Sequence, residues 1–440
     1  MSQQDSSTAK FQPSWESLKA YTVPHWYEDA KFGIFIHWGL YSVKGIPESW
    51  SWFNGQISHD DYFKQREGFS AANYDPQQWA ALFERAGARY AVLTTKHHDG
   101  FALWPTEQSD LKTNRDLVGP YCDALREKDL HVGLYFSHLD WSHPGYTAVP
   151  IDRLGAGKMN NADGSWTFAA DSPEWEGFLA FHRAQLQELC ERYSPELLWF
   201  DGSWEPDVEY WRYEELSQAL HSWQPDVILN SRMGGYGDYE TPEQGVPIAP
   251  PEGPWEFCVT INDSWGYQPH DHNHKSVRQI VRMFCECIGM GGNMLLDIGP
   301  RADGSIQPEF VERLEALGAW IRPHEEAIYA TGAGLPAGHF YGASTLSSDQ
   351  TTLYLFLFDR PWDEVAVKGL LNKVQRVSVV GSGQELSHRM IGGAPWAGVP
   401  GVLWIDVPES ELDPNSTVLK VELDGPLHLY RGSGHAIESN

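Results

Sequence analysis

Short runs of apolar residues recur along the first 300 residues, and most of them end on a polar side chain. The runs, with the residues that end them, are Phe32–Gly39, Tyr90–Lys96, His131–Ser137, Leu197–Gly202, Val227–Arg232, Phe257–Asn262 and Asn293–Ile298. Runs of this length, bounded by polar residues, are typical of buried β-strands. We therefore predict seven strands, each with its polar end at an edge of the sheet.

Segments with apolar residues at helical spacing separate these strands. One begins at Asp75-Pro76, where a capping side chain precedes a first-turn proline. The others cover Leu117–Lys128, Glu176–Tyr193, Tyr213–Ser222, Ser276–Ile288 and Pro308–Tyr329. Alternation of strands and helices predicts a parallel sheet, and the length of the segment predicts a (β/α)8-like barrel of the TIM type with room for one irregular βα unit.

The pattern changes near residue 330, where Gly332, Gly334, Pro336 and Gly338 interrupt the chain. Beyond them the predicted strands are Thr352–Phe358, Glu364–Val367, Val374–Val380, Gly401–Val407 and Thr417–Leu423. Short strands separated by turn residues predict a β-sandwich of roughly a hundred residues. We expect an α/β protein with a catalytic barrel domain over residues 1–335 and a C-terminal β-sandwich domain over residues 336–440.

The composition agrees with two globular domains and restricts the classes of molecule that the protein can bind. The chain has 440 residues and a net charge of −28 without a basic run, which argues against a nucleic-acid partner. Aromatic residues make up 13% of the chain, as expected either for stacking on sugars or for a large aromatic core. The five cysteines lack the spacing of a disulfide framework, and their odd number leaves at least one thiol free, which fits a reducing compartment.

No targeting or membrane segment is predicted. The N-terminal residues 1–8 have neither a basic start nor an apolar run, and no later stretch reaches the ~18 unbroken apolar residues of a membrane helix. We expect no membrane partner, a cytoplasmic location for the chain as given, and a periplasmic or secreted one if a signal was removed. The oligomeric state stays open, with a homo-oligomer among the alternatives.

Asp201 is the centre of the candidate site because it ends a predicted strand at the barrel rim. A helix cap or a turn would also explain an isolated aspartate there. However, Glu243 lies in a turn-rich loop after the strand that ends at Arg232, and so belongs to the same rim. Paired carboxylates suit glycoside hydrolysis, in which one attacks the anomeric carbon and the other protonates the leaving oxygen and later activates water. Each of the loop glutamates in this region could equally be a solvated side chain; they are Glu240, Glu243, Glu252 and Glu256.

Two histidine-rich segments raise the alternative of a metal site. Adjacent histidines on an extended strand point to opposite faces, so His97 and His98 reach one ion only if the strand ends between them. Neutral imidazoles that bind sugar hydroxyl groups explain the same residues without a metal. Residues 270–274 have a metal-like composition, but we interpret them as a polar loop, and we expect no metal and no cofactor.

Several motifs, in the same order, resemble the α-L-fucosidases of glycoside hydrolase family 29 between about residues 26 and 300. The motifs are Ala30–Gly39, Tyr90–Trp104 with Lys96-His97-His98-Asp99-Gly100-Phe101, Trp199-Phe200-Asp201-Gly202, Trp255-Glu256 through Ser264–Tyr267, and Gly291–Leu296. The resemblance implies a barrel followed by a β-sandwich, and a retaining, exo-acting, metal-independent enzyme. Its expected partner is a fucosylated carbohydrate, from which it removes terminal α-L-fucosyl residues.

The resemblance also implies roles for individual positions. Asp201 becomes the nucleophile that forms a covalent fucosyl-enzyme, Glu243 the acid/base, and Glu256 the alternative acid/base. The implied sugar-binding residues are Phe35, His37, Glu48, Trp50, His97, His98, Tyr135, Arg232 and Trp265. Within this set the histidines would bind hydroxyl groups, whereas Phe35 and Trp265 would enclose the apolar side of fucose with its C6 methyl group.

One motif departs from the family pattern. Many members have an adjacent Glu-Trp pair after the first strand, whereas this chain has Glu48-Ser49-Trp50. Trp50 matches the tryptophan, and Glu48 is the candidate for the displaced glutamate. This departure leaves open an exo-glycosidase for a related α-L-sugar such as α-L-galactose. Because fold alone does not fix function, a catalytically idle carbohydrate-binding protein on the same fold is a second alternative, and a metal-dependent hydrolase that uses the histidines is a third.

Overall fold

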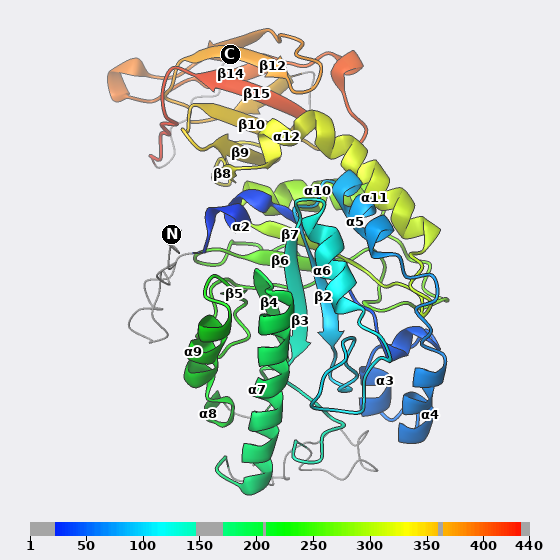
Figure 1. Cartoon of the computed structure of the whole chain (residues 1–440). Coiled ribbons are helices and arrows are strands. Elements are labelled where there is room, and N and C mark those ends of the chain that lie inside the picture. Colours follow the sequence, from blue (N-terminus) through cyan, green and yellow to red (C-terminus); the bar gives the residue numbers. More distant parts are fainter. Residues whose placement is uncertain (1–22, 147–169, 206–207, 360–363, 433–440) are drawn as a thin grey trace, which may run out of the picture.

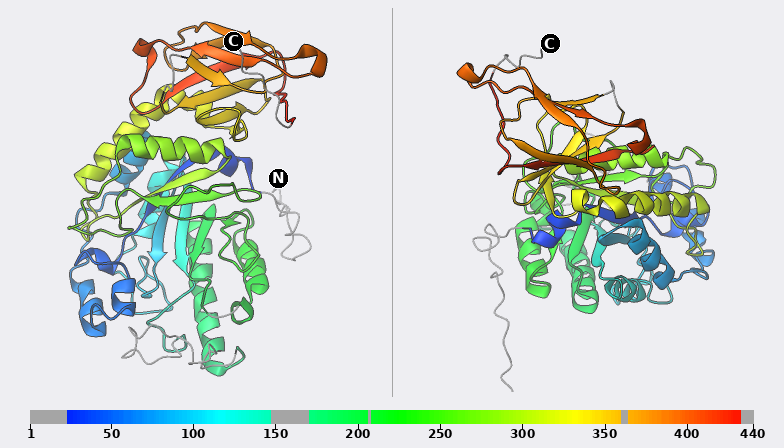
Figure 2. Two further views of the ribbon diagram at one scale, coloured as in Figure 1. Left: turned by 180° about the vertical axis from the view of Figure 1, so that it is seen from behind. Right: turned by 90° about the horizontal axis from the view of Figure 1, so that it is seen from above.

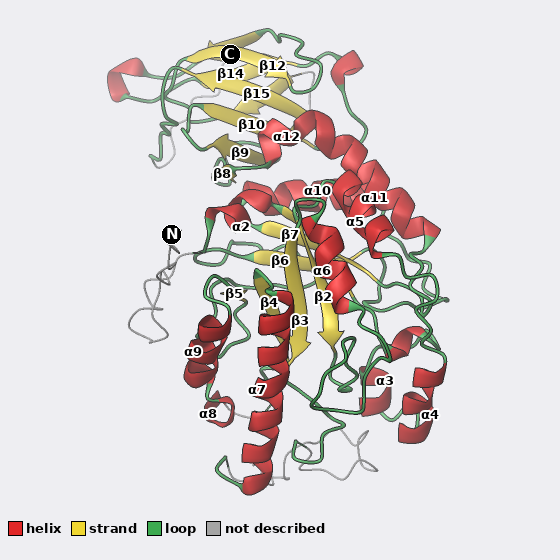
Figure 3. Cartoon of the chain, in the orientation of Figure 1, coloured by secondary structure: helices red, strands yellow, loops and turns green. Residues whose placement is uncertain are grey.

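The computed structural model describes residues 23–146, 170–205, 208–359 and 364–432 (Figure 1). Figure 3 distinguishes a part with strands surrounded by helices from a C-terminal part built mostly of strands. The helical elements are α2 (His25–Ala30), η1 (Leu40–Ser42), α3 (Trp50–Phe53), α4 (His59–Phe63), η2 (Lys64–Glu67), α5 (Pro76–Ala86), α6 (Val118–Arg126), α7 (Pro173–Tyr193), α8 (Val208–Trp211), α9 (Tyr213–Trp223), α10 (Val277–Gly289), α11 (Pro308–Ile321), η4 (Arg322–His324), α12 (Glu325–Ile328), η5 (Pro395–Ala397) and η6 (Glu409–Glu411). The strands are β1 (Phe32–Ile36), β2 (Tyr90–Lys96), β3 (His131–Ser137), β4 (Leu197–Asp201), β5 (Ile228–Leu229), β6 (Glu256–Thr260), β7 (Asn293–Ile298), β8 (Thr331–Ala333), β9 (Ala343–Ser347), β10 (Thr352–Leu357), β11 (Glu364–Val367), β12 (Val374–Val379), β13 (His388–Ile391), β14 (Val402–Asp406) and β15 (Thr417–Leu423).

The first seven strands form one parallel sheet in the order β5-β4-β3-β2-β1-β7-β6. The first strand lies in the middle of this order because β1 pairs with β2 on one side and with β7 on the other. Residues of β1, β2, β4 and β7 are buried along their whole length, since helices cover the outside and side chains fill the interior. Burial on both faces is the reason that these strands appear in the sequence as continuous apolar runs.

An extended segment, residues 239–243, lies between the two edge strands of this sheet. It forms isolated parallel bridges with both neighbours, which join Asn230 to Tyr239, Glu240 to Trp255 and Glu243 to Cys258. Backbone hydrogen bonds of 2.7 Å from Asp238 to Leu229 and of 3.1 Å from Cys258 to Pro242 hold its two sides. No helix lies within residues 244–254, all of which the structure describes. The predicted TIM-type barrel is thus confirmed, and residues 239–254 are its irregular unit.

Capping residues explain where several helices begin. The Asp75 side chain accepts a hydrogen bond from the Gln78 amide at 3.1 Å, and Pro76 occupies the first turn of α5. The predicted helix over 308–329 is wrong in one respect, because α11 ends at Ile321 and α12 begins only at Glu325. Pro323 lies between them, and a proline has no N–H to continue the helical hydrogen bonds.

The C-terminal strands form a five-stranded antiparallel sheet, β12-β15-β10-β9-β8, and a three-stranded sheet, β11-β14-β13. Side chains alternate along β10: Leu353 and Leu355 enter the core between the two sheets, whereas Tyr354 and Phe356 join the core of the barrel. The five-stranded sheet therefore lies between the smaller sheet and the barrel, as Figure 2 also shows. Trp320 of α11 donates a hydrogen bond of 2.9 Å to the carbonyl of Ser416 across this boundary.

The predicted β-sandwich is confirmed, although three of its strands were not predicted, namely β8, β9 and β13. The division of the chain at residue 335 stays a prediction, and β8, at residues 331–333, already pairs with β9. The five cysteines are all buried free thiols. In the described ranges, every helix is too short or too polar to cross a bilayer.

Candidate active site

A cavity of about 140 Å³ opens at the carboxyl ends of the barrel strands. Thirteen residues line it: Phe35, His37, Glu48, Trp50, His97, His98, Tyr135, Trp199, Asp201, Trp204, Arg232, Glu243 and Trp265. Eleven of them are the residues that the sequence placed in the site, and the other two are Trp199 and Trp204. Larger surface hollows of about 660 and 700 Å³ lie beside α4 and α5, but neither contains one of the two candidate catalytic carboxylates.

Asp201 is held at the rim by the geometry at the end of β4. The Asn230 side chain accepts a hydrogen bond from the Phe200 amide and donates one to its carbonyl, both at 2.9 Å. This amide group continues the pairing of β4 after β5 has ended, which explains why the predicted strand over 227–232 is only two residues long. Gly202 then turns the chain with φ of 85°, where any other side chain would clash with Leu139.

Three donors fix the orientation of the Asp201 carboxylate. Tyr135 donates from its hydroxyl group to Oδ2 at 2.7 Å, and the Gly202 amide donates to Oδ1 at 2.9 Å. The guanidinium group of Arg232 also donates to Oδ1. Burial, followed by the negative charge of Asp201, raises the pKa of Tyr135 well above its usual value, so Tyr135 keeps its proton and remains a donor.

Arg232 joins the two candidate catalytic carboxylates. One terminal nitrogen of its guanidinium group donates to Asp201 and the other to Glu243. The guanidinium group lies 4.7 Å from the centre of the Trp199 ring, on its face. The Glu243 side chain is 39% exposed and the Asp201 side chain only 12%, which places Glu243 nearer the cavity mouth.

A buried histidine pair supports the backbone of Arg232 from behind. His138 Nε2 lies 3.0 Å from the Arg232 carbonyl oxygen, and His138 Nδ1 lies 3.1 Å from His182 Nε2. The backbone amide of His138 also donates to the Asp201 carbonyl at 2.8 Å. Burial lowers the pKa of His138 to about 3, so the ring is neutral. A neutral His138 that donates to the Arg232 carbonyl must accept from His182, which orders this chain of hydrogen bonds.

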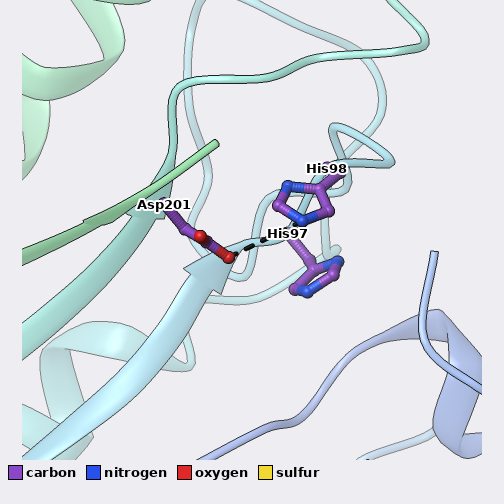
Figure 4. Close-up of side chains that lie close together, drawn as sticks. All are labelled: His97, His98 and Asp201. Carbon is purple, nitrogen blue, oxygen red and sulfur yellow. Dashed lines mark ion pairs between the residues drawn. The ribbon is translucent and has the colours of Figure 1, made fainter. Parts of the chain in front are cut away.

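His97 and His98 follow β2 and approach Asp201 (Figure 4). Their Nδ1 atoms each lie 2.6 Å from a serine hydroxyl oxygen, of Ser49 for His97 and of Ser137 for His98. Their Nε2 atoms have no such partner among the residues that the structure describes, and that of His98 lies 3.6 Å from Asp201 Oδ2. Burial lowers the pKa of both rings well below its usual value. Each ring is therefore uncharged and can bind a hydroxyl group as donor or acceptor.

The same three side chains have the spacing of a metal site. Ligand atoms of His97, His98 and Asp201 all lie within 4.8 Å of one another. Arg232 already supplies a positive charge at the Asp201 carboxylate, so a cation would have to compete with it. In the predicted polar loop over residues 270–274, the Asp271 carboxylate accepts from the Asp263 amide at 3.0 Å, within its own loop.

Glu48 supplies the carboxyl group at the corner where the sequence departs from the family pattern. Its Oε1 accepts a hydrogen bond of 2.6 Å from the amide of Gly266, next to Trp265. Burial raises the pKa of Glu48 to about 7. Ser49 instead contacts His97, as described above, so that Glu48 rather than Ser49 lines the cavity.

Glu256 lies outside the cavity. It is the first residue of β6, at the end of the strand opposite the rim, and it is fully buried. Its carboxyl group accepts hydrogen bonds from Tyr90 and Tyr27, and from Trp199 Nε1 at 2.8 Å. Burial raises the pKa of Glu256 to about 7. Between the two candidate glutamates, only Glu243 has access to a bound ligand.

His37 was expected in the site, but its partner Asp297 was not, because no local sequence pattern marks it. His37 Nδ1 lies 2.6 Å from Asp297 Oδ1, and this pair joins strands that are 260 residues apart. Trp199 and Trp204 did carry a signal, because they lie within three residues of Asp201 on the strand and its rim loop.

A buried carboxylate, a second carboxyl group at the mouth and uncharged imidazoles on a barrel rim define the class of barrel glycoside hydrolases. Comparisons with known proteins agree. The alpha-L-fucosidase family model matches residues 1–326. The tissue alpha-L-fucosidase of Macaca fascicularis is 36% identical over 359 residues, which is 73% of this chain and 72% of that protein.

Solved structures show the same likeness. Alpha-L-fucosidase isoenzyme 1 from Paenibacillus thiaminolyticus has a TM-score of 0.80 and 34% identity, and the match covers 91% of this chain and 98% of that one. A trapped covalent intermediate of a GH29 alpha-L-fucosidase from Bacteroides thetaiotaomicron has a TM-score of 0.79 and 26% identity, covering 91% of this chain and 96% of that one. The chain belongs to the α-L-fucosidase family, glycoside hydrolase family 29.

Proposed function

We propose that this chain is a retaining exo-α-L-fucosidase that removes terminal α-L-fucosyl residues from oligo- or polysaccharides by double displacement. The observation that carries this proposal is the guanidinium group of Arg232, which joins the buried Asp201 to the exposed Glu243 in one cavity. Family membership supports the substrate, and the trapped covalent intermediate of the Bacteroides relative supports the mechanism.

In the first step, an oxygen of Asp201 attacks the anomeric carbon while Glu243 donates its proton to the glycosidic oxygen. The bond between the anomeric carbon and that oxygen breaks, and the aglycone leaves as an alcohol. Tyr135 and the Gly202 amide keep the nucleophile in a fixed orientation. We expect the two carboxyl groups to lie about 5 to 5.5 Å apart, as in other retaining enzymes.

In the second step, Glu243 accepts a proton from a water molecule, whose oxygen attacks the same carbon. The covalent bond to Asp201 breaks, and fucose leaves with its original anomeric configuration. Glu243 suits both steps because it lies at the exposed mouth, where the aglycone departs and water enters.

The walls of the cavity fit a deoxy sugar. Neutral His37, His97 and His98 can bind hydroxyl groups without placing additional charge in the site. Phe35 and Trp265 lie edge to face, with ring centres 6.1 Å apart, and offer an apolar surface for the C6 methyl group.

Hydrolysis of 4-nitrophenyl α-L-fucoside tests the proposal. We expect Asp201→Ala to lose activity. Glu243→Ala should slow by about 10²- to 10⁴-fold, and azide should restore its turnover because azide attacks the covalent intermediate without a general base. A chelator should leave the wild-type rate unchanged. Full activity of Asp201→Ala would overturn the mechanism. Wild-type activity on an α-L-galactoside but not on the fucoside would overturn the sugar assignment, and inactivity on both would favour a carbohydrate-binding protein.

A further inference from the structure

One large aromatic side chain at the cavity mouth has no part in the proposed binding of fucose. Trp204 lines the cavity, yet the residue is 50% exposed. Its ring is stacked on that of Trp50, with centres 6.1 Å apart and an angle of 21° between the planes. It also meets the His98 ring edge to face at 5.8 Å. One face of an apolar ring therefore remains open to solvent beside the site.

The depth of the site shows which part of a substrate would meet this ring. The Asp201 side chain is 12% exposed and that of Glu243 39%, and Trp204, taken as a whole residue, is 50% exposed. The sugar that reacts with Asp201 occupies the inner end, and the oxygen that Glu243 protonates points toward the mouth. The aglycone begins at that oxygen, so it passes Trp204 on its way out.

The loop that carries Trp204 is held on both sides. Before it, the Gly202 amide is bound to Asp201, as described above. After it, the Glu205 carboxyl group accepts a hydrogen bond of 3.0 Å from the Tyr146 hydroxyl group, and the Glu205 carbonyl accepts one of 2.7 Å from Trp211 Nε1. A ring held in this way loses little conformational freedom when a ligand binds, which strengthens binding.

We propose that Trp204, supported by Trp50, forms an aglycone subsite that binds an uncharged pyranose ring by stacking against its C–H face. The inference rests on the proposed fucosidase function and extends it to the sugar that precedes fucose in the substrate. Stacking on an aromatic face needs no hydrogen-bond partner and no charge. An anionic aglycone would be disfavoured, because Glu243 lies at the mouth of the cavity and the whole chain carries a net charge of −28.

Three substrates with the same fucosyl group test the subsite. α-L-Fucosyl fluoride has no aglycone ring, 4-nitrophenyl α-L-fucoside has a flat ring, and an α-L-fucosyl-galactose disaccharide has a pyranose ring. For Trp204→Ala we expect the kcat/KM on each ring-bearing substrate, divided by the kcat/KM on the fluoride, to fall about 3- to 10-fold. Trp204→Phe should recover most of that ratio, because it keeps an aromatic face.

Trp396→Ala is the matched control. Trp396 is 87% exposed in η5 of the C-terminal domain, so its loss removes an exposed tryptophan from another surface, and we expect all three rates to stay unchanged. Equal losses of Trp204→Ala on all three substrates would overturn the subsite, because the ring would then act on the fucosyl group or on the shape of the site. The subsite would also be overturned if Trp204→Ala left the rates on all three substrates unchanged. Wild-type inactivity on all three fucosides would instead overturn the proposed function.

Discussion

Replacement of Glu256 by glutamine separates a structural carboxyl group from a catalytic one. Glu256 is fully buried and receives hydrogen bonds from Tyr90, Tyr27 and Trp199. Glutamine has nearly the same shape and cannot ionise, but it has only one acceptor oxygen, which can accept either from the two tyrosines or from Trp199. We expect Glu256→Gln to retain fucosidase activity within a few-fold, whereas Glu243→Gln loses it.

The same substitution should change how stability depends on pH. Burial raises the pKa of Glu256 from 4.5 to about 7, so between these pH values the folded protein holds a proton that the unfolded chain has released. The resulting stabilisation is fully present below pH 4.5 and is lost as the pH rises through 7. A difference of about 2.5 between the two pKa values corresponds to about 3 kcal/mol. Glutamine removes this contribution to the pH dependence.

Thermal unfolding of both proteins at pH 5 and pH 8 measures the effect. Relative to wild type, Glu256→Gln should be more stable at pH 8 than at pH 5 by about 2.5 kcal/mol, a change of about 3 °C in the difference between their midpoints. Other buried carboxyl groups are the same in both proteins, so their effects cancel. Parallel pH curves for the two proteins would refute the reasoning on stability, and a loss of activity rescued by azide would make Glu256 the acid/base.

Three further predictions concern charges and support around the site. Arg232→Ala should lower kcat/KM on 4-nitrophenyl α-L-fucoside by more than about 10²-fold, because the two site carboxylates lose the cation that holds them together; a loss of only a few-fold would contradict this. His138→Phe keeps an aromatic ring but removes the hydrogen bond to the Arg232 carbonyl, so kcat/KM should fall about 3- to 10-fold. His324 is also buried and bound to a backbone carbonyl, but it lies away from the site, so His324→Phe should leave kcat/KM unchanged. Lys96 and Asp140 form a buried ion pair at 3.3 Å. Lys96→Met leaves the Asp140 charge buried without its cation, so thermal unfolding should show a loss of stability of about 3 to 5 kcal/mol, and adding Asp140→Leu should recover part of it. Equal losses in the single and double variants would refute this account.

Most of the barrel was predictable because each of its strands is buried on both faces and therefore appears as an apolar run. Features that depend on single side chains were not. The strand predicted over residues 227–232 ends at Leu229, because the side chain of Asn230 takes the place of backbone pairing with β4. In the C-terminal domain, β8 and β13 are short, and β13 has no buried residue, while β9 has the sequence Ala-Ser-Thr-Leu-Ser with a single large apolar side chain, so these strands carry little pattern.

The candidate site was predictable to the extent that it consists of residues at strand ends. Asp201, His97 and His98 share one rim because parallel strands all end there. The sequence favoured Glu243 as the acid/base, because its loop follows the strand that ends at Arg232, and left Glu256 as the alternative. Their difference depends on which end of the barrel each occupies and on the aromatic groups that cover Glu256, and both are properties of the assembled barrel.

The extended segment that lies between β5 and β6 has a consequence for how this enzyme can vary. Glu243 is the last residue of this segment to pair with β6, so its position is set before the chain turns outward into residues 244–254. Those residues contain four prolines and the fully exposed Ile248, and they replace the helix that follows other strands. Surface loops accept added length at small entropic cost. This stretch is therefore a place where residues can be inserted, to carry a tag or a binding peptide next to the catalytic rim, while the proposed acid/base stays in register with the barrel.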